Sequence, residues 1–267
     1  MKEENGNMIY FFDGTKNGFL TAFCAAFHDE TALLTSTQAQ LKLGEESVHI
    51  ITNDSTAKRA AERLSSFDGD FAYDLDILMR SGMPNHEQIA FRYFRLLALH
   101  KRPINKRLAE PDVYDAVACM RKVGHEIHKL HGFVRFIETA SDALYAPISP
   151  DNDICDLLAP HFKARFPLFP FVIHDVKRKK AAVYDGKNIL LASLEKADIL
   201  LSAKETEWQS LWRKYYQSVT IAARTSAERE KQMRGNMPVR YWKFLTERQE
   251  APQKKVEIQQ ITLPGTR

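Results

Sequence analysis

The hydrophobic period of the chain changes at Gly132, and this change constrains the fold more than any other feature of the sequence. Before Gly132, apolar residues recur every three or four positions, as on the buried face of a helix. After Gly132, residues 133–138 and 144–148 carry a period of two, which is typical of strands. The sequence therefore predicts strands and helices first, and an antiparallel sheet packed with helices later.

The N-terminal part contains two strand-helix units. The apolar run 8–12 predicts a buried strand that ends at Asp13-Gly14-Thr15, and apolar residues between Phe19 and Phe27 then follow at helical spacing. A second strand is expected at 48–52, with Ser55 as the N-cap of the next helix. Further helices are expected at 71–79 and 87–100. This part of the chain is predicted to be α/β.

A charged segment bracketed by prolines, residues 102–111, is the best linker candidate. We therefore expect an N-terminal α/β unit at 1–105, an α+β unit at 106–250 and a flexible tail at 251–267. The 267 residues, of which 44% are hydrophobic, are enough for one large domain or two modest ones.

The second part is predicted to combine a long helix with a sheet. The helix begins near Asp112 and ends at Gly132, which suits the C′ position. A meander is expected from the runs 171–176, 181–184 and 189–191, because Asp185-Gly186 is a strong hairpin signal. A short helix is expected between the strands, from Ile154 to Phe166. The overall fold class is α/β to α+β, with C-terminal helices.

The last predicted helix covers about residues 205–224. Its buried stripe is expected to consist of Trp208, Trp212, Tyr215, Val219 and Ala222, at steps of four, three, four and three. The opposite face would carry a ridge of Arg213, Gln217, Thr220 and Arg224. Such a ridge suits phosphate contact, but it is equally typical of an ordinary solvated face.

Charge, cysteine content and the lengths of the apolar runs indicate which partners and which cellular location to expect. The net charge is only +4, but ten Lys and Arg oppose five Glu between residues 204 and 248. Cys24, Cys119 and Cys155 are odd in number and far apart, so we expect reduced core thiols. No apolar run is long enough to span a membrane and no signal peptide is recognisable, so the expected location is cytoplasmic, without a membrane partner.

Two candidate chemical motifs are weak. Asp13-Gly14-Thr15 after a strand suggests phosphoaspartyl transfer, but that motif needs an acidic residue where Phe11 stands, and a turn with a helix cap explains it better. His125, His128 and His131 follow at spacing three, but their faces diverge on a helix and no carboxylate is suitably spaced. We predict no metal site and no cofactor.

Two polar pairs are better candidates for chemistry. His161 and Arg165 lie four residues apart on one helical face, and His174 with Asp175 precedes the basic turn 177–180. Arginine offers a bidentate fork and histidine a titratable donor, which together suit a nucleic-acid phosphate. These four residues are the catalytic candidates. The alternative is that His174 and Asp175 only alternate between the two faces of a strand.

A family resemblance becomes specific in the second part. The chain resembles the family described as probable DNA metabolism proteins, which also occurs as a domain fused to uracil-DNA-glycosylase-like domains. The matching motifs, besides the opening segment 10–27, are His131-Gly132-Phe133-Val134-Arg135-Phe136, Tyr145-Ala146-Pro147-Ile148-Ser149-Pro150, residues 158–166, Ile173-His174-Asp175, Leu211-Trp212-Arg213-Lys214-Tyr215-Tyr216 and Met237-Pro238-Val239-Arg240-Tyr241-Trp242.

The resemblance implies a role in DNA repair or modification beside a radical-SAM protein, and it carries no assigned catalytic residue. This chain has no Cys-x-x-x-Cys-x-x-Cys motif, so the iron-sulfur chemistry would reside in that partner. We therefore expect a DNA-associated accessory protein. The alternatives are an enzyme that uses the His/Arg/Asp residues and an adaptor that never touches DNA.

The expected DNA contacts come from aromatic and basic residues of the second part. Tyr216 and Trp242 are expected to stack on bases. The residues expected to contact phosphates are Arg135, Arg165, Lys177, Arg178, Lys179, Arg213, Arg224 and Arg240.

Overall fold

The computed structural model describes residues 8–37, 46–221 and 226–249, and the chain divides into two compact units, 1–124 and 125–267. The predicted fold class is confirmed, since strand-helix units come first and a mostly antiparallel sheet with helices follows. The division lies inside α5 (Pro111–Phe133) rather than at residue 105. The reason is packing, because Val113, Ala116 and Cys119 of α5 belong to the core of the first unit.

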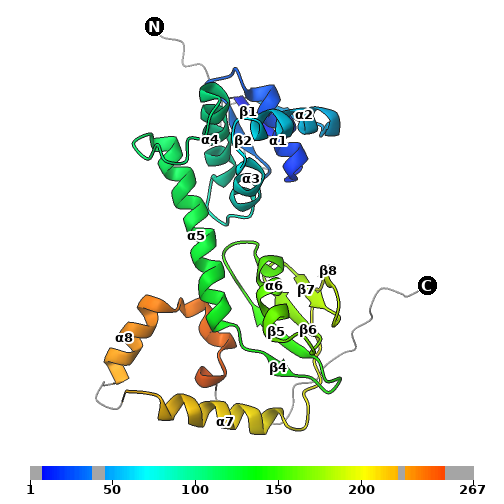
Figure 1. Ribbon diagram of the computed structural model, residues 1–267, viewed down its shortest axis with the longest axis vertical. Helices are drawn as coiled ribbons and strands as arrows, with labels where there is room; N and C mark the ends of the chain where they lie inside the picture. Colours follow the sequence, from blue (N-terminus) through cyan, green and yellow to red (C-terminus); the bar gives the residue numbers. More distant parts are fainter. Residues whose placement is uncertain (1–7, 38–45, 222–225, 250–267) are drawn as a thin grey trace, which may run out of the picture. The chain divides into compact units, whose positions relative to one another are not determined.

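The first unit is a parallel three-stranded sheet with helices packed against it. Strand β1 (Met8–Phe11) is central, between β2 (Leu33–Thr35) and β3 (Glu46–His49). Helix α1 (Lys16–Ala26) connects β1 with β2, as in a βαβ unit. Figure 1 labels the remaining helices of this unit, which are α2 (Asp54–Ser65), α3 (Phe71–Met79) and α4 (His86–His100).

The turn after β1 is a structural cap. Thr15 is the N-cap of α1, and the Asp13 carboxylate accepts hydrogen bonds from the Thr15 backbone (2.9 Å) and from the Thr52 hydroxyl (2.7 Å). The interpretation of Asp13 as part of a turn is thus confirmed. A Cβ on Gly18 would lie 2.0 Å from Asp13 Oδ1, so only glycine allows this close approach. The expected cap at Ser55 is wrong, because Asn53 caps α2.

The second unit contains a five-stranded sheet in the order β4-β5-β6-β7-β8. Its members are β4 (Ile137–Glu138), β5 (Leu144–Ile148), β6 (Phe171–Asp175), β7 (Lys180–Tyr184) and β8 (Ile189–Ser193). The meander β6-β7-β8 is antiparallel as predicted, whereas β5 and β6 are parallel, because α6 (Cys155–Arg165) connects them. Figure 1 shows α6 along one face of this sheet.

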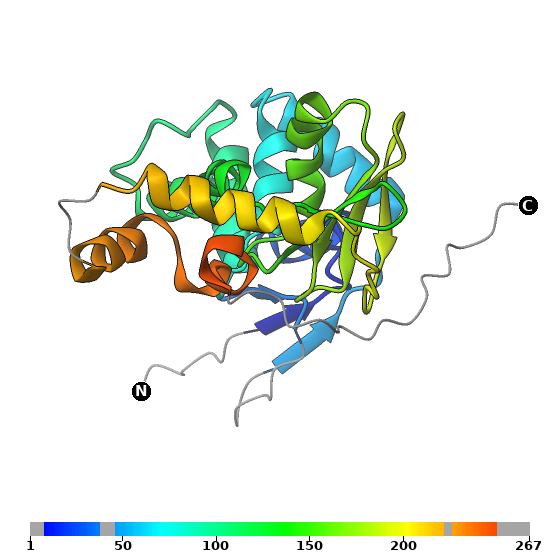
Figure 2. The ribbon, with the colours of Figure 1, turned by 90° about the horizontal axis from the view of Figure 1, so that it is seen from below.

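In the described part of the chain, two α-helices and two short 3-10 helices follow the sheet, and Figure 2 shows them from below. They are α7 (Glu205–Ser218), α8 (Ser226–Asn236) and the two short 3-10 helices η1 (Val239–Phe244) and η2 (Thr246–Arg248). Residues Ala222, Arg224 and 251–267, which the sequence assigned to a helix and a tail, lie outside the described residues. Helix α5 also continues past Gly132, so the strand predicted at 133–138 is shortened to β4.

The buried stripe predicted for α7 is wrong. Trp208, Tyr215 and Val219 are more than half exposed, whereas the buried residues of the helix are Glu205 and Gln209. The reason lies in backbone hydrogen bonding, because Glu205 Oε2 accepts from the backbone N–H of Glu138 in the edge strand β4 (2.8 Å) and Glu205 Oε1 accepts from Gln209 (2.9 Å). The polar residues Glu205 and Gln209 therefore face inward, where Glu205 satisfies the sheet edge, and Trp208 and Tyr215 are left exposed.

The cysteines are all free, but they are not all in the core. Cys119 and Cys155 are buried, as expected. Cys24 is exposed, so the prediction of a core thiol is wrong at that position. Within the part of the chain that the structure describes, we find no helix with the length and apolar character needed to cross a bilayer.

A buried carboxyl group marks the core of the first unit. Asp74 of α3 is 7% exposed and accepts a hydrogen bond from the Tyr93 hydroxyl (3.2 Å). Burial, together with the charges of Asp68 and Asp70, outweighs this hydrogen bond and raises the pKa of Asp74 to about 6. An ionised Asp74 therefore weakens the fold at neutral pH.

We predict that Asp74→Asn raises the free energy of unfolding at pH 8 by at most about 3 kcal/mol, the equivalent of a shift of roughly two pH units. Because the folded pKa is raised, the contribution of wild-type Asp74 is fully present below pH ~4 and is lost as pH rises through about 6. Urea denaturation from pH 4 to 8 should show the variant and the wild type converging at the acidic end. A constant difference across this range would contradict the prediction.

Candidate functional site

An open groove of about 610 Å³ lies within the second unit, between the β4 region, the loop after α6 and one side of α7. Its aromatic and aliphatic lining comprises Phe136, Leu144, Phe166, Phe169, Trp208 and Trp212, and its polar lining comprises Arg135, Glu138, Asp142, Lys204, Glu205, Gln209 and Thr246. We call this feature the aromatic groove.

The groove has a fixed floor and an exposed rim. Phe136 packs edge-on against Phe162, Phe166 and Phe171, with ring centroids 4.9–5.7 Å apart, so its orientation is set by the core. Phe169 and Trp208 at the rim are 53% and 54% exposed. Aromatic surface of this kind is therefore available to a ligand without any rearrangement of the core.

A buried carboxylate, Glu247, positions the polar part of the groove. Its side chain is only 2% exposed, and it accepts hydrogen bonds from Arg135 (2.9 Å) and from Trp212 Nε1 (2.8 Å). The Arg135 guanidinium also lies over the Trp212 ring, 4.9 Å from its centroid. Burial opposes ionisation of Glu247, but these donors outweigh it, so the pKa of Glu247 lies below its ordinary value.

The charge of the groove does not favour a polyanion. Two cations, Arg135 and Lys204, line it together with three carboxylates, Glu138, Asp142 and Glu205. Trp208 Nε1 donates to Glu138 (3.1 Å), which fixes the indole at the rim. A phosphate chain in this groove would meet more negative than positive charge.

The residues predicted to contact phosphates are mostly held by carboxylates or by the backbone. Arg135 pairs with Glu247, Arg178 with Asp175 (2.9 Å), Lys179 with Glu195 (3.0 Å), and Arg240 with Glu126 (2.6 Å) and Asp151 (2.9 Å). Arg213 donates to the Thr246 carbonyl and to Gln209, so its guanidinium is already engaged within the chain. Arg224 lies outside the described residues.

Arg165 and Lys177 are different, because both are exposed and no carboxylate of the described chain lies within ion-pair distance of either. They lie toward opposite ends of α6. Arg165 is the last residue of α6, whereas Lys177 follows Asp175, whose charge is felt by Cys155 at the start of the same helix. The eleven residues of α6 place these two ends about 15 Å apart.

The two aromatic residues predicted to stack on bases have other roles. Trp242 lies under two guanidinium groups, with Arg248 4.1 Å and Arg234 5.4 Å from its ring centroid, and its Nε1 donates to the Met237 carbonyl. The Tyr216 hydroxyl contacts Met233 Sδ at 3.5 Å. Both side chains thereby connect the helical segments with one another.

The four catalytic candidates do not meet in one cleft. His161 and Arg165 are exposed on α6, whereas His174 and Asp175 are buried neighbours on β6 that point to opposite faces of the sheet. His174 is bonded to the Tyr145 hydroxyl (2.7 Å) and the Leu194 carbonyl (2.8 Å), and burial lowers its pKa. Asp175 accepts from Arg178 and from the backbone of the following turn.

The three histidines at the end of α5 diverge as the sequence predicted. His125 and His128 are exposed, whereas His131 stacks on His161 with ring centroids 4.0 Å apart. Burial lowers the pKa of His131, and the charges of His161 and His128 lower it further. Its position in the stack therefore favours the neutral form of His131.

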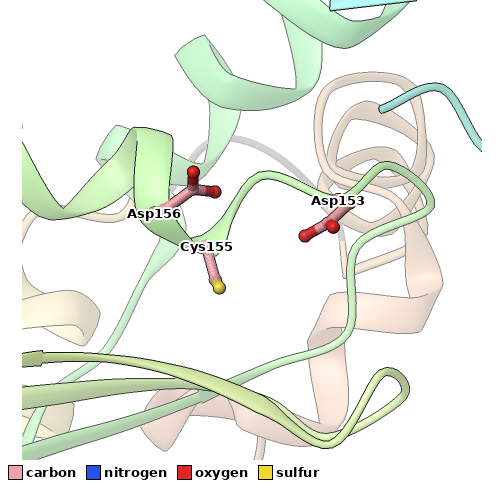
Figure 3. Close-up of side chains that lie close together, drawn as sticks. All are labelled: Asp153, Cys155 and Asp156. Carbon is pink, nitrogen blue, oxygen red and sulfur yellow. The ribbon is translucent and has the colours of Figure 1, made fainter. Parts of the chain in front are cut away.

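Among the residues that the structure describes, a group of potential metal ligands lies at the start of α6. Figure 3 shows Asp153, Cys155 and Asp156, whose ligand atoms lie within 4.8 Å of one another. Lys180 donates to both carboxylate oxygens of Asp153 (2.9 Å each), and burial raises the pKa of the Cys155 thiol to about 12. A protonated thiol and a carboxylate already paired with an ammonium group make a poor cation site.

The sequence interpretation missed the carboxylates that organise this unit, namely Glu126, Glu205 and Glu247. Each lies in a polar stretch that looks solvated. The only sequence signal is indirect, because a buried arginine such as Arg135, placed in an apolar strand pattern, requires an acidic partner from elsewhere.

The chain matches a known protein-family model. Residues 84–247 match the model of a family whose description is a domain of unknown function, DUF4130. No curated protein and no solved structure matches the chain.

We predict that Glu247→Gln lowers the free energy of unfolding by about 3 kcal/mol, because it leaves the Arg135 charge without its buried partner. The emission of Trp212 should change as well, since its N–H loses a charged acceptor. Glu195→Gln, which breaks the exposed pair with Lys179, serves as the control and should cost less than about 1 kcal/mol. Chemical denaturation followed by tryptophan fluorescence measures both. Equal effects of the two substitutions would show that the prediction is wrong.

Proposed function

The chain belongs to the DUF4130 family, a domain of unknown function, and we propose that it is a non-catalytic accessory protein that binds a partner protein in the aromatic groove. The observation that carries this proposal is the half-exposed pair Phe169 and Trp208 above a floor of ordered aromatic rings. Exposed aromatic residues around a concave surface are typical anchors for an apolar segment of another protein.

The balance of charge at the groove favours a protein ligand over a nucleic acid. Carboxylates outnumber cations among its lining residues, and Arg135 is already held by Glu247. An apolar side chain with a neutral or basic neighbour fits this environment, whereas a phosphate backbone would be repelled.

The biological setting of the proposal is DNA repair or modification, and its support is the resemblance to the probable DNA metabolism proteins. The same resemblance supplies the first candidate partner, a radical-SAM protein. In this arrangement the partner performs the chemistry and this chain supplies a docking surface. The dispersal of His161, Arg165, His174 and Asp175 argues against a catalytic cleft built from those residues.

We predict that Phe169→Ala weakens binding of the purified partner at least tenfold, because an exposed anchor at the rim is lost while the core remains unchanged. The partner is first identified by co-purification from the native host and then titrated against the isolated chain by calorimetry. Leu190→Ala, at an exposed position on β8 that does not line the groove, is the matched control and should bind like the wild type. If Phe169→Ala binds as tightly as the wild type, the groove is not the docking site.

Direct DNA contact is a second candidate, because Arg165 and Lys177 are the predicted phosphate-contact residues of the described chain that are exposed and have no carboxylate partner. Two phosphate contacts would give a slope of log K against log salt of about −2, by the rule of roughly −0.9 per phosphate. We therefore expect weak binding of the isolated chain to single- and double-stranded DNA, with a slope no steeper than this. A slope near −4.5, corresponding to about five phosphates, would contradict the protein-adaptor proposal. It would indicate instead that DNA binding is the main function of the chain.

A further inference from the structure

The outward face of α7 carries a second surface, which adjoins the aromatic groove at Lys204 and Trp208. Trp208, Leu211 and Tyr215 are 54%, 57% and 55% exposed, and they fall within about 60° of one another around the helix. A shallow hollow of about 480 Å³ lies over this face, lined by Lys204, Thr206, Glu207, Trp208, Ser210, Leu211 and Lys214. Spacings of three and four residues between large apolar side chains are typical of a helix-helix seam.

Two opposite charges flank this apolar stripe on the same side. Glu207 and Lys214 project within about 20° of each other, next to the stripe. Both are exposed, and in the described chain neither has an ion-pair partner. They are seven residues apart, which corresponds to about 10 Å along the helix, so they cannot pair with each other as neighbours three or four residues apart would.

We propose that this face pairs with the same face of a second copy of the chain, as two antiparallel α7 helices related by a two-fold axis. A two-fold axis perpendicular to both helices keeps the flanking residues of the two copies on the same side. With the axis between Ser210 and Leu211, Glu207 of each copy lies opposite Lys214 of the other. The two Leu211 side chains then meet at the centre, and Trp208 of each copy lies beside Tyr215 of the other.

The positions of Glu207 and Lys214 indicate that a second copy of the chain is the partner that binds this face. One patch supplies both members of the ion pair, and it supplies them at the spacing that an antiparallel self-pairing requires. Such self-complementarity is the property of an isologous interface, and two-fold dimers are the commonest oligomers. A single helix seam is smaller than the roughly 800 Å² per partner of a standard interface, so the dimer should dissociate on dilution.

The dimer goes beyond the proposed function, because it uses the outer face of α7 rather than the aromatic groove. Trp208 contributes to both surfaces and is therefore left unchanged in the test. Leu211, Glu207 and Lys214 do not line the groove. A wild-type chain that stays monomeric but binds the partner would refute only this inference, and a Phe169→Ala variant that still dimerises and binds the partner as tightly as the wild type would refute only the proposed function.

The test is sedimentation equilibrium of the full chain over a wide range of protein concentration. We expect a monomer-dimer equilibrium for the wild type, and at least tenfold weaker association for Glu207→Lys and for Lys214→Glu, because each places like charges opposite one another. The double variant Glu207→Lys/Lys214→Glu restores the pairs with reversed sign and should recover most of the wild-type association. Leu211→Glu should abolish association, whereas Leu190→Glu, equally exposed in the wild type at 57%, should not affect it.

Circular dichroism establishes that each variant is folded before its association is compared. A wild-type chain that stays monomeric at every concentration overturns the proposal. So does a double variant that associates no better than the single variants, because only reciprocal pairing between copies predicts the recovery. If Glu207→Lys alone proves unfolded, Lys214→Glu and the double variant carry the same comparison.

Discussion

The second unit depends on one buried carboxylate, that of Glu126 in the C-terminal half of α5. It is 5% exposed and accepts hydrogen bonds from the backbone of Asp151 and Asn152 (3.0 and 2.9 Å), from Arg240 (2.6 Å) and from the Tyr241 hydroxyl. Burial opposes its ionisation, but these donors together outweigh burial, so the pKa of Glu126 lies below its ordinary value. One charge thus joins a helix, a loop of the sheet and the segment η1.

The hydrogen-bonded cluster around Glu126 determines how these segments pack, because few other arrangements would supply the buried carboxylate with donors. A buried carboxylate without its donors would cost several kcal/mol, so α5, the loop at 151–152 and η1 must come together in a single way. The same logic holds for Arg135 with Glu247 and for Arg178 with Asp175. Arginines that would otherwise make the surface basic therefore form ion pairs with buried carboxylates within the second unit.

Because charged side chains of the second unit face inward, apolar side chains of α7 are left exposed on the surface. Glu205 accepts a hydrogen bond from the edge strand β4 and is itself held by Gln209, so helix α7 turns these two polar residues inward and leaves Trp208, Leu211 and Tyr215 exposed. The aromatic groove and the apolar stripe on α7 are two consequences of this orientation. The proposed partner site and the proposed dimer face both follow from the hydrogen bonding of one sheet edge.

Local patterns explain the part of the fold that the sequence predicted well. Helical periodicity located α3, α4 and most of α5, and the Asp185-Gly186 hairpin signal with alternating apolar residues located β7 and β8. These features depend on residues a few positions apart, so the sequence carries them directly. The boundary between the units was harder to place, because the first half of α5 packs on one unit while its second half belongs to the other.

The sequence by itself determined the fold class, many of the helices and strands, and the excess of positive charge in the second half. Only the tertiary structure decided which cations are free and which face of α7 is buried. The physical reason is that the partners are remote along the chain, with Arg135 and Glu247 112 residues apart and Arg240 and Glu126 114 residues apart. No local period encodes such pairs, and they form only when the fold brings the two groups together.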